Sequence, residues 1–205
     1  MLKLYGSPGM GSAVVEAVLQ LANQPYEYVK TSFWDQNKHF AALIEANPQA
    51  KVPTLVFDDG TVMTESAAAI VYFAEKVPGL IPPDPVKRAV FLRWMLFIPA
   101  NIYAMFDIGD EPSRWVDDEA TQQSLKEKSV EKQKYFWSLM EQNLSPAPYV
   151  LGDAMTALDI YIAMVSRWRP GRAWFNEHCP KLAGAVALTE VHPVVARVWE
   201  KNFGK

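Results

Sequence analysis

The sequence predicts a small α/β domain followed by an all-α domain, and three observations lead to this class. The first 78 residues alternate between short apolar runs typical of strands and amphipathic runs typical of helices. A proline-rich stretch then covers residues 78–85, and every long segment beyond it has helical periodicity. We therefore expect a first domain at 1–78, a linker at 79–85 and a helical domain at 86–205.

The first domain is expected to contain a mixed sheet. A strand–helix–strand start requires parallel strands, whereas the turn signal Asp58-Asp59-Gly60 joins antiparallel ones. The expected strands lie at 2–5, 26–29, 54–57 and 61–64. The expected helices lie near 12–23, 38–46 and 67–76.

The second domain is expected to contain only helices, at 86–106, 117–142, 156–169 and 193–202. Pro99 falls inside the first of these and should kink it, because proline cannot donate the backbone hydrogen bond. Thr156 and Asp159 form a capping-box pattern with Asp in place of the usual Glu, which predicts a helix start at Thr156.

Composition and charge exclude several function classes. Residues 1–80 carry 5 Lys/Arg against 8 Asp/Glu, and residues 81–205 carry 15 against 15, so no basic face for nucleic acid is expected. The single cysteine, Cys179, cannot form an intramolecular disulfide, and the three histidines lack ligand spacing. We expect no metal.

The apolar stretch Trp94–Phe106 is too short to span a bilayer, so no membrane association is expected. The chain starts Leu2-Lys3-Leu4-Tyr5, without the pattern of a secretory signal. We therefore expect a cytoplasmic protein.

The segment from Val52 to Ser66 predicts a binding site for the amino-acid end of a peptide. Ser66 lies at a helix start, where a hydroxyl and the positive end of the helix dipole attract a carboxylate. The preceding Glu65 carboxylate suits an ammonium group. An amino acid, or the free amino-acid end of a peptide, carries both groups on one carbon.

Val52 adds a backbone edge to this site. Because Pro53 follows it, Val52 should be extended, with its N–H and C=O available to pair with an extended peptide. An X-Pro bond at such a turn can be cis. A serine at a helix start is common in ordinary capped helices, and a proline is common in ordinary turns. The two together, in this order along the chain, are less ordinary and make the combination informative.

Several short motifs follow one another in a set order along the chain: Leu4-Tyr5-Gly6-Ser7-Pro8, Asn47-Pro48, Lys51-Val52-Pro53, Glu65-Ser66, and Gly152-Asp153 before Thr156. This ordered set resembles the cytosolic glutathione S-transferases, of bacterial type, over essentially the whole chain. The resemblance implies a thioredoxin-like first domain that binds glutathione as cosubstrate, a helical domain lining an electrophile pocket, a homodimer and a role in detoxification.

The resemblance also implies roles for individual residues. Val52 would pair through its backbone with the cysteinyl part of glutathione, with Pro53 as the family's cis-proline. Glu65 and Ser66 would hold the γ-glutamyl end. The further glutathione contacts implied are Lys51 beside the peptide and Lys38 or His39 near the glycine carboxylate.

Catalysis requires the thiolate, because a free thiol has a pKa of roughly 8.5. The family's activating hydroxyl or cysteine lies in the loop after the first strand. Met10 stands where plant phi-class enzymes have serine, and Gly11 where bacterial beta-class enzymes have cysteine. Ser12 is the nearest hydroxyl, and it is either the thiolate donor or a helix N-cap.

Three other hydroxyls stay open as donors. Aligning Trp94 with the tryptophan of the beta-class helix places Tyr103 at that class's histidine near the thiol. Tyr103 also lies on an apolar stripe that is typical of core packing. Ser7 and Tyr5 lie in or beside the first-strand loop, and the Tyr5 ring could instead be core.

The first function hypothesis is conjugation of glutathione to small apolar electrophiles, since a pocket rich in Tyr, Phe, Trp and Met favours apolar substrates. One alternative is a non-catalytic glutathione-binding or protein-interaction member of the fold, like the stringent starvation proteins. Another is a glutathione-dependent disulfide reductase, although Cys179 lies far along the sequence from the first-strand loop.

Overall fold

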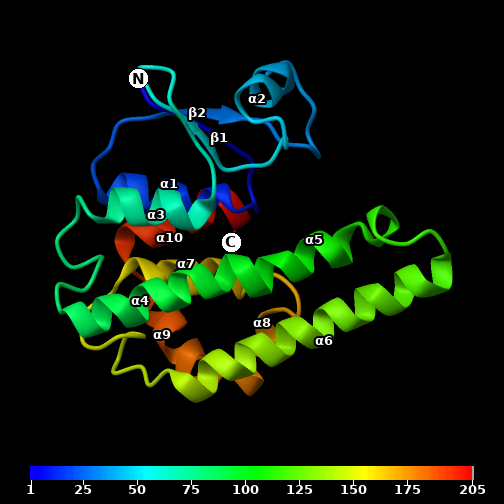
Figure 1. The fold of residues 1–205 in the computed structure, drawn as a ribbon. Coiled ribbons are helices and arrows are strands. Elements are labelled where there is room, and N and C mark those ends of the chain that lie inside the picture. Colours follow the sequence, from blue (N-terminus) through cyan, green and yellow to red (C-terminus); the bar gives the residue numbers. More distant parts are fainter. Residues whose placement is uncertain (205) are drawn as a thin grey trace. The chain divides into compact units, whose positions relative to one another are not determined.

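The computed structural model describes residues 1–204 and divides into two compact units (Figure 1). The first unit comprises residues 1–81 together with the described residues from Leu188 onward, and the second comprises residues 82–187. The first is an α/β unit and the second is helical, which confirms the predicted fold class.

The first unit is built on a four-stranded sheet of order β2-β1-β3-β4. β1 (Lys3–Gly6) pairs in parallel with β2 (Glu27–Lys30) and antiparallel with β3 (Thr54–Val56). β3 pairs antiparallel with β4 (Val62–Met63). The predicted mixed sheet is therefore confirmed, with the hairpin where the Asp-Asp-Gly turn indicated it.

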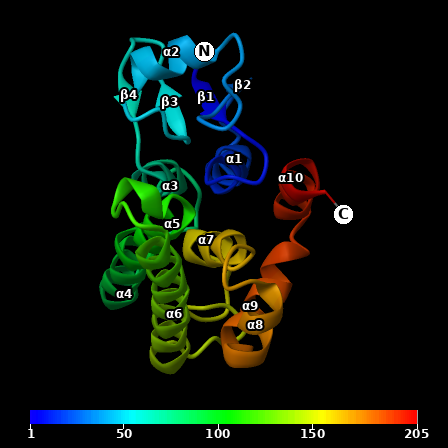
Figure 2. The same cartoon turned by 90° about the vertical axis from the view of Figure 1, so that its right-hand side faces the viewer.

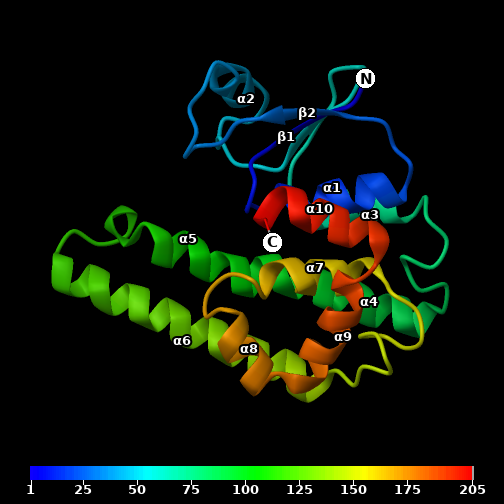
Figure 3. The same cartoon turned by 180° about the vertical axis from the view of Figure 1, so that it is seen from behind.

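Helices cover both faces of this sheet. α1 (Ser12–Leu21) and α3 (Ser66–Ala74) lie on one face and α2 (Phe40–Ala46) on the other (Figure 2). Residues 12–19 of α1 are all buried, because α1 also packs against α3 and α10 (Pro193–Phe203) (Figure 3). A helix that is apolar on nearly every side is typical of such a central position.

A buried carboxylate fastens α10 to α1. Glu16 accepts hydrogen bonds from the Tyr26 hydroxyl at 2.9 Å and from Asn202 Nδ2 at 2.9 Å, and it forms an ion pair with Lys201. Charged groups are buried at low cost only when they are paired and hydrogen-bonded in this way. The sequence analysis assigns α10 to the helical domain, but its packing groups it with the first unit.

The helical unit begins with a continuous helical stretch. α4 (Pro85–Phe97) runs into a π-helix, η1 (Ile98–Tyr103), and then into α5 (Ala104–Asp110). Pro99 was expected to kink this stretch, and the structure has wider π-helical turns there. The helical stretch Pro85–Asp110 is also long and apolar enough to span a membrane, but core helices of soluble proteins meet the same criteria.

The remaining helices include two that the sequence analysis did not predict, α8 (Arg172–His178) and α9 (Pro180–Glu190). Both are short or only weakly amphipathic, so periodicity gives little signal for them. The elements after α5 are η2 (Pro112–Arg114), α6 (Glu119–Asn143), α7 (Ala157–Val165), α8 (Arg172–His178) and α9 (Pro180–Glu190).

The predicted capping box begins α7. The Thr156 backbone N–H donates to Asp159 Oδ2 at 2.8 Å, and the Thr156 hydroxyl donates to the same oxygen at 2.7 Å. The Val150 N–H donates to Asp159 Oδ1 at 2.8 Å. Burial nevertheless raises the pKa of Asp159, and its three hydrogen bonds oppose that rise.

Candidate functional site

Two buried polar side chains fix the loop that leads into β3. Asn47 Nδ2 donates to the Lys51 carbonyl at 3.2 Å and to Thr54 Oγ1 at 3.0 Å. The Thr54 hydroxyl in turn donates to the Lys51 carbonyl at 2.8 Å. Asn47 and Thr54 are both buried, so these bonds are shielded from water and hold the loop in one conformation.

This loop presents the backbone of Val52. The Val52–Pro53 peptide bond is cis, as the resemblance implied. The N–H and C=O of Val52 have no hydrogen-bond partner within residues 1–204. Its side chain packs against the core cluster of Tyr5, Val29 and Leu43. Val52 is therefore anchored through its side chain while its backbone can pair with a ligand.

The start of α3 lies at the same end of the hairpin. Leu55 pairs with Met63 in the antiparallel β3–β4 ladder, and continuing this register brings the segment before β3 opposite Glu65 and Ser66. The hairpin thus brings together the two halves of the predicted peptide site.

Glu65 has an unusual backbone conformation. It is the N-cap of α3, with φ 63° and ψ 104°, and its carbonyl accepts the first helical bond from the Ala69 N–H at 3.0 Å. A positive φ is uncommon for a residue other than glycine and is concentrated at functional sites. The Glu65 side chain is exposed, and Ser66 is the first residue of the helix.

The basic residues of the predicted site lie at the surface. Lys51 is exposed and directly precedes Val52. His39 is exposed at the N-cap position of α2, where its backbone N–H donates to Asn37 Oδ1 at 2.9 Å. Lys38 is exposed beside it.

Ser12 does not occupy either position expected for it. Its hydroxyl is fully buried, accepts a hydrogen bond from the Ser7 N–H at 3.1 Å and donates to the Ser7 carbonyl at 3.2 Å. Since a hydroxyl has one proton, none remains for a thiolate in this conformation. The N-cap of α1 is Gly11. Ser12 was expected to be the thiolate donor or the N-cap of α1. In the structure its hydroxyl instead closes the first-strand loop through its hydrogen bonds to Ser7.

Gly6 makes this closure possible. A Cβ atom at Gly6 would lie 2.7 Å from the Cβ and Oγ of Ser12 and 3.0 Å from Tyr28 Cε2. Any larger residue would push Ser12 away from Ser7. The glycine is thus required by the close approach of the strand end to α1.

The other two hydroxyls near this loop differ in their surroundings. The Tyr5 ring is buried in the core cluster with Val29 and Leu43, which is the core position that the sequence analysis gave as its alternative. The hydroxyl of Ser7 makes no hydrogen bond to the rest of the described chain, and both contacts of Ser7 with Ser12 use its backbone atoms. Ser7 also lines a pocket.

This pocket lies where the loops after β1 and β2 meet, because the carboxyl ends of parallel strands share one edge of a sheet. It is open to solvent and has a volume of about 550 Å³. The Thr31 N–H donates to the Gly6 carbonyl at 2.9 Å and ties the two loops together. The lining residues are Ser7, Pro8, Gly9, Met10, Lys30, Ser32, Trp34 and Asp35.

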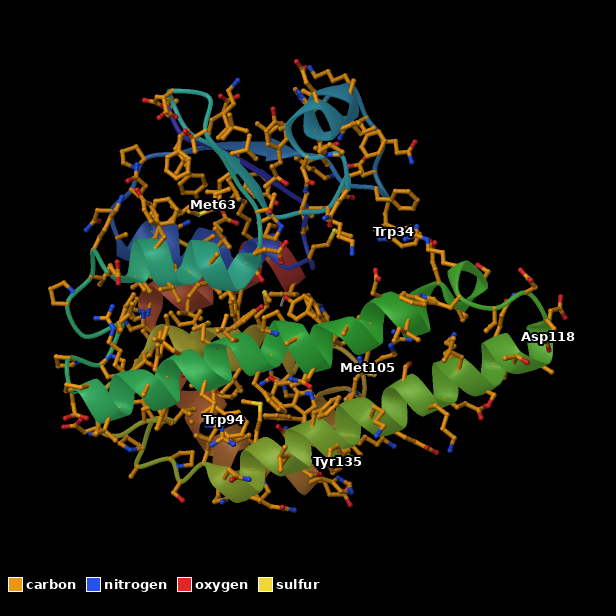
Figure 4. All side chains as sticks on the ribbon, viewed as in Figure 1. Trp34, Met63, Trp94, Met105, Asp118 and Tyr135 are labelled. Carbon is orange, nitrogen blue, oxygen red and sulfur yellow. The ribbon has the colours of Figure 1, made fainter. Side chains whose placement is uncertain are left out.

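A tight turn forms one wall of the pocket. The Ser32 N–H donates to the Asp35 carbonyl at 3.3 Å, and the Asp35 N–H donates back to the Ser32 carbonyl at 3.1 Å. Trp34 projects from the tip of this turn (Figure 4) and packs edge-on against Phe33. The sequence analysis missed this wall, although its position after a strand parallel to the first one was an available signal.

Tyr103 belongs to the helical unit and ends the π-helix. Its ring packs against Phe106, Tyr161 and Trp168, with centroids 5.2 to 6.1 Å apart. Its hydroxyl oxygen is buried, and burial, followed by the neighbouring Tyr161 phenol, raises the pKa of Tyr103 well above its usual value. The phenol therefore stays protonated and capable of donating.

The described residues contain no group of three or more His, Cys, Asp or Glu suited to a metal ion. The candidate site consists of the Val52 backbone edge, the start of α3 and the pocket lined by Ser7 and Ser32.

Comparison with known proteins identifies relatives of this arrangement. Residues 4–80 match the family model of the glutathione S-transferase N-terminal domain. The chain is 32% identical over 204 residues to the uncharacterized GST-like protein YncG of Escherichia coli K12, with 98% of each chain covered. It is 25% identical to glutathione S-transferase GstA of Escherichia coli O157:H7, with 82% of each covered.

Among solved structures, a glutathione transferase homologue from Sulfitobacter with bound glutathione matches with a TM-score of 0.87. The sequences are 27% identical, and 98% of each chain is covered.

Proposed function

Because the chain belongs to the glutathione S-transferase family, we propose that it is a glutathione transferase that joins glutathione to small, largely apolar electrophiles. One observation carries the proposal. The unpaired backbone of Val52 and the α3 start at Glu65 flank the same end of one hairpin, where a short peptide with a free amino-acid end fits both.

In this proposal glutathione lies along the hairpin end. Its cysteinyl part pairs with the N–H and C=O of Val52, beside Pro53. The Glu65 carboxylate accepts from the γ-glutamyl ammonium, and Ser66 with the α3 N-terminus receives the carboxylate. Lys51 and His39 are the further glutathione contacts.

The Ser7 hydroxyl is the proposed donor to the sulfur, since Ser12 is committed to the loop, and Tyr103 is the second candidate. Lowering the thiol pKa by about two units needs roughly 2.7 kcal/mol of preferential interaction with the thiolate. The thiol proton passes to solvent, the resulting thiolate attacks the electrophilic carbon, and a C–S bond forms as the leaving group departs with its electron pair.

A non-catalytic glutathione-binding protein is the second candidate. The observation that favours it is the loop itself, where Met10 and Gly11 offer no hydroxyl or thiol and the Ser12 proton is already donated. A disulfide reductase is disfavoured, because Cys179 is fully buried and burial raises its pKa to about 12.

We further propose a cytoplasmic homodimer with a role in detoxification. Leu92 and Leu96 lie four residues apart on α4 and are 37% and 59% exposed. Residues at this spacing share one helix face, and an exposed apolar face is typical of an interface with another protein chain.

The test is calorimetric titration with glutathione, followed by a conjugation assay with 1-chloro-2,4-dinitrobenzene. We expect binding below millimolar concentration and turnover that Ser7→Ala diminishes more than Tyr103→Phe. Absence of binding at millimolar glutathione would contradict both candidates. Binding without thiolate absorbance or turnover would favour the non-catalytic one.

A further inference from the structure

One wall of the pocket between the β1 and β2 loops carries an unpartnered hydroxyl. Ser32 is 1% exposed, and its Oγ has no hydrogen-bond partner in the described chain, although the residue lines the pocket. Its backbone groups are both used in the turn with Asp35, so the side chain is held in place. Buried hydroxyls are nearly always hydrogen-bonded, and a molecule in the pocket can supply the missing partner.

The charges of the pocket indicate which kind of molecule. Its lining contains one cation, Lys30, and one anion, Asp35, whose side chains lie 3.8 Å apart. Together they give the pocket no net charge. It therefore discriminates by hydrogen bonding, offering donors at Lys30 and the hydroxyls and an acceptor at Asp35.

The rest of the lining is apolar, formed chiefly by Pro8, Met10 and Trp34. A ring or short hydrocarbon chain would contact these side chains, and a polar group at its end would reach the turn between Ser32 and Asp35. The Ser7 hydroxyl lines the same pocket, so a molecule held there lies beside the proposed thiolate donor.

We propose that this pocket selects electrophiles with an apolar body and a neutral polar end that both donates and accepts hydrogen bonds, such as a primary amide. Ser32 donates to its oxygen and Asp35 accepts from its nitrogen. This inference rests on the proposed function, and it names the class of electrophile that the same site would take. A carboxylate end is disfavoured at the amide position, because it cannot donate a hydrogen bond to Asp35 and adds a like charge beside it.

The test compares glutathione conjugates made from 4-chloro-3-nitrobenzamide, from methyl 4-chloro-3-nitrobenzoate and from 4-chloro-3-nitrobenzoate. In each, the sulfur replaces chloride, which leaves with the bonding electron pair. The three conjugates differ only in an amide, ester or carboxylate end. Calorimetric titration of the whole protein measures their binding without requiring turnover, and the corresponding kcat/KM values are measured where turnover occurs.

We expect the amide conjugate to bind roughly fivefold to tenfold more tightly than the ester conjugate, the worth of one hydrogen bond. Asp35→Ala should remove this preference, because Asp35 accepts from the amide nitrogen that the ester lacks. Ser32→Ala should weaken the amide and ester conjugates equally, because both carry the carbonyl oxygen to which Ser32 donates, whereas Thr61→Ala, which removes an exposed hydroxyl on the hairpin turn, should leave both affinities unchanged. Asp35→Asn should raise binding of the carboxylate conjugate about threefold to tenfold, because a like charge is removed.

The stability of Ser32→Ala separates a binding role from a structural one. Because the hydroxyl makes no bond in the chain, its removal should leave the urea midpoint unchanged or raise it. A lowered midpoint would assign the hydroxyl to the fold and overturn the proposal.

Three further outcomes would also overturn it: equal binding of amide and ester conjugates, tightest binding of the carboxylate, or an equal loss of affinity for glutathione itself in Ser32→Ala. The last would assign the pocket to glutathione. Failure of the wild type to bind glutathione is a different result, since it contradicts the proposed function.

Discussion

The Ser12 hydroxyl accepts a hydrogen bond from the Ser7 N–H at 3.1 Å and donates one to the Ser7 carbonyl at 3.2 Å. One buried side chain thus closes the first-strand loop and uses its only proton in doing so. The same closure leaves the Ser7 hydroxyl at the pocket. The two serines therefore have separable roles, one structural and one proposed as chemical.

Ser12→Ala should lower the free energy of unfolding by about 1–3 kcal/mol, because it leaves the Ser7 N–H without its partner, while the Ser7 carbonyl keeps its bond from the Met10 N–H at 3.2 Å. Urea unfolding monitored by far-UV circular dichroism measures this loss. A variant as stable as wild type would contradict the closing role of Ser12.

Ser7→Ala is the matched substitution, since the Ser7 contacts with Ser12 use backbone atoms only. We expect stability within about 0.5 kcal/mol of wild type, as for other substitutions away from structural contacts. The kcat/KM should fall about 100-fold, as expected for loss of one donor to a developing or stabilised anion. Retention of full activity would transfer the donor role to Tyr103, which Tyr103→Phe then tests.

Glu65→Gln should weaken glutathione binding about tenfold, because a neutral amide replaces the carboxylate that accepts from the γ-glutamyl ammonium. Calorimetric titration at constant salt measures the affinity. Glu27→Gln, an exposed carboxylate on β2, is the control and should bind as wild type. Equal affinity in both variants would show that the ammonium lies elsewhere.

Cys179 should resist alkylation by iodoacetamide in the native protein at pH 8. Burial raises its pKa to about 12, so the reactive thiolate is scarce until the protein unfolds. The raised pKa of Cys179 also makes the stability of the fold depend on pH. Between the ordinary thiol pKa and about 12 only the unfolded state loses this proton, so rising pH through that window destabilises the fold.

Measuring iodoacetamide incorporation by mass spectrometry, with and without urea, tests this directly. Rapid labelling of the folded chain would return the disulfide reductase to consideration, since a reactive thiol is what that chemistry requires.

Leu96→Lys should convert the proposed homodimer to a monomer, because it introduces a charge into the apolar face of α4. Sedimentation velocity measures the change. Leu188→Lys on α9 substitutes another leucine, 41% exposed, and serves as the control that should stay dimeric. A monomeric wild type would contradict the homodimer without affecting the glutathione site.

Much of the fold was predictable because its signals are local. The Asp58-Asp59-Gly60 turn between two apolar runs indicated the β3–β4 hairpin, and the Thr156 and Asp159 pattern indicated the start of α7. Both depend on interactions between residues close in sequence. The same locality allowed the α3 start at Ser66, after Glu65, to be predicted, and with it a proposed ligand that carries an ammonium and a carboxylate.

Other features depend on residues far apart in the chain. The sequence could not indicate that Ser12 turns inward, because this follows from the close approach of Gly6 and α1. Nor could it group α10 with the first unit, since that depends on Glu16 meeting Asn202. Asn47 and Thr54 were present in the motifs, but only packing shows that they hold the Val52 loop.

The amino-acid sequence by itself therefore determined the fold class and the hairpin that carries the glutathione half of the proposed site. Tertiary structure alone decided which serine faces the pocket and which hydroxyl, Ser32, lacks a partner there. The physical reason is that a turn or cap is encoded by its own few residues. The direction of a hydroxyl instead depends on which distant segments fold against it.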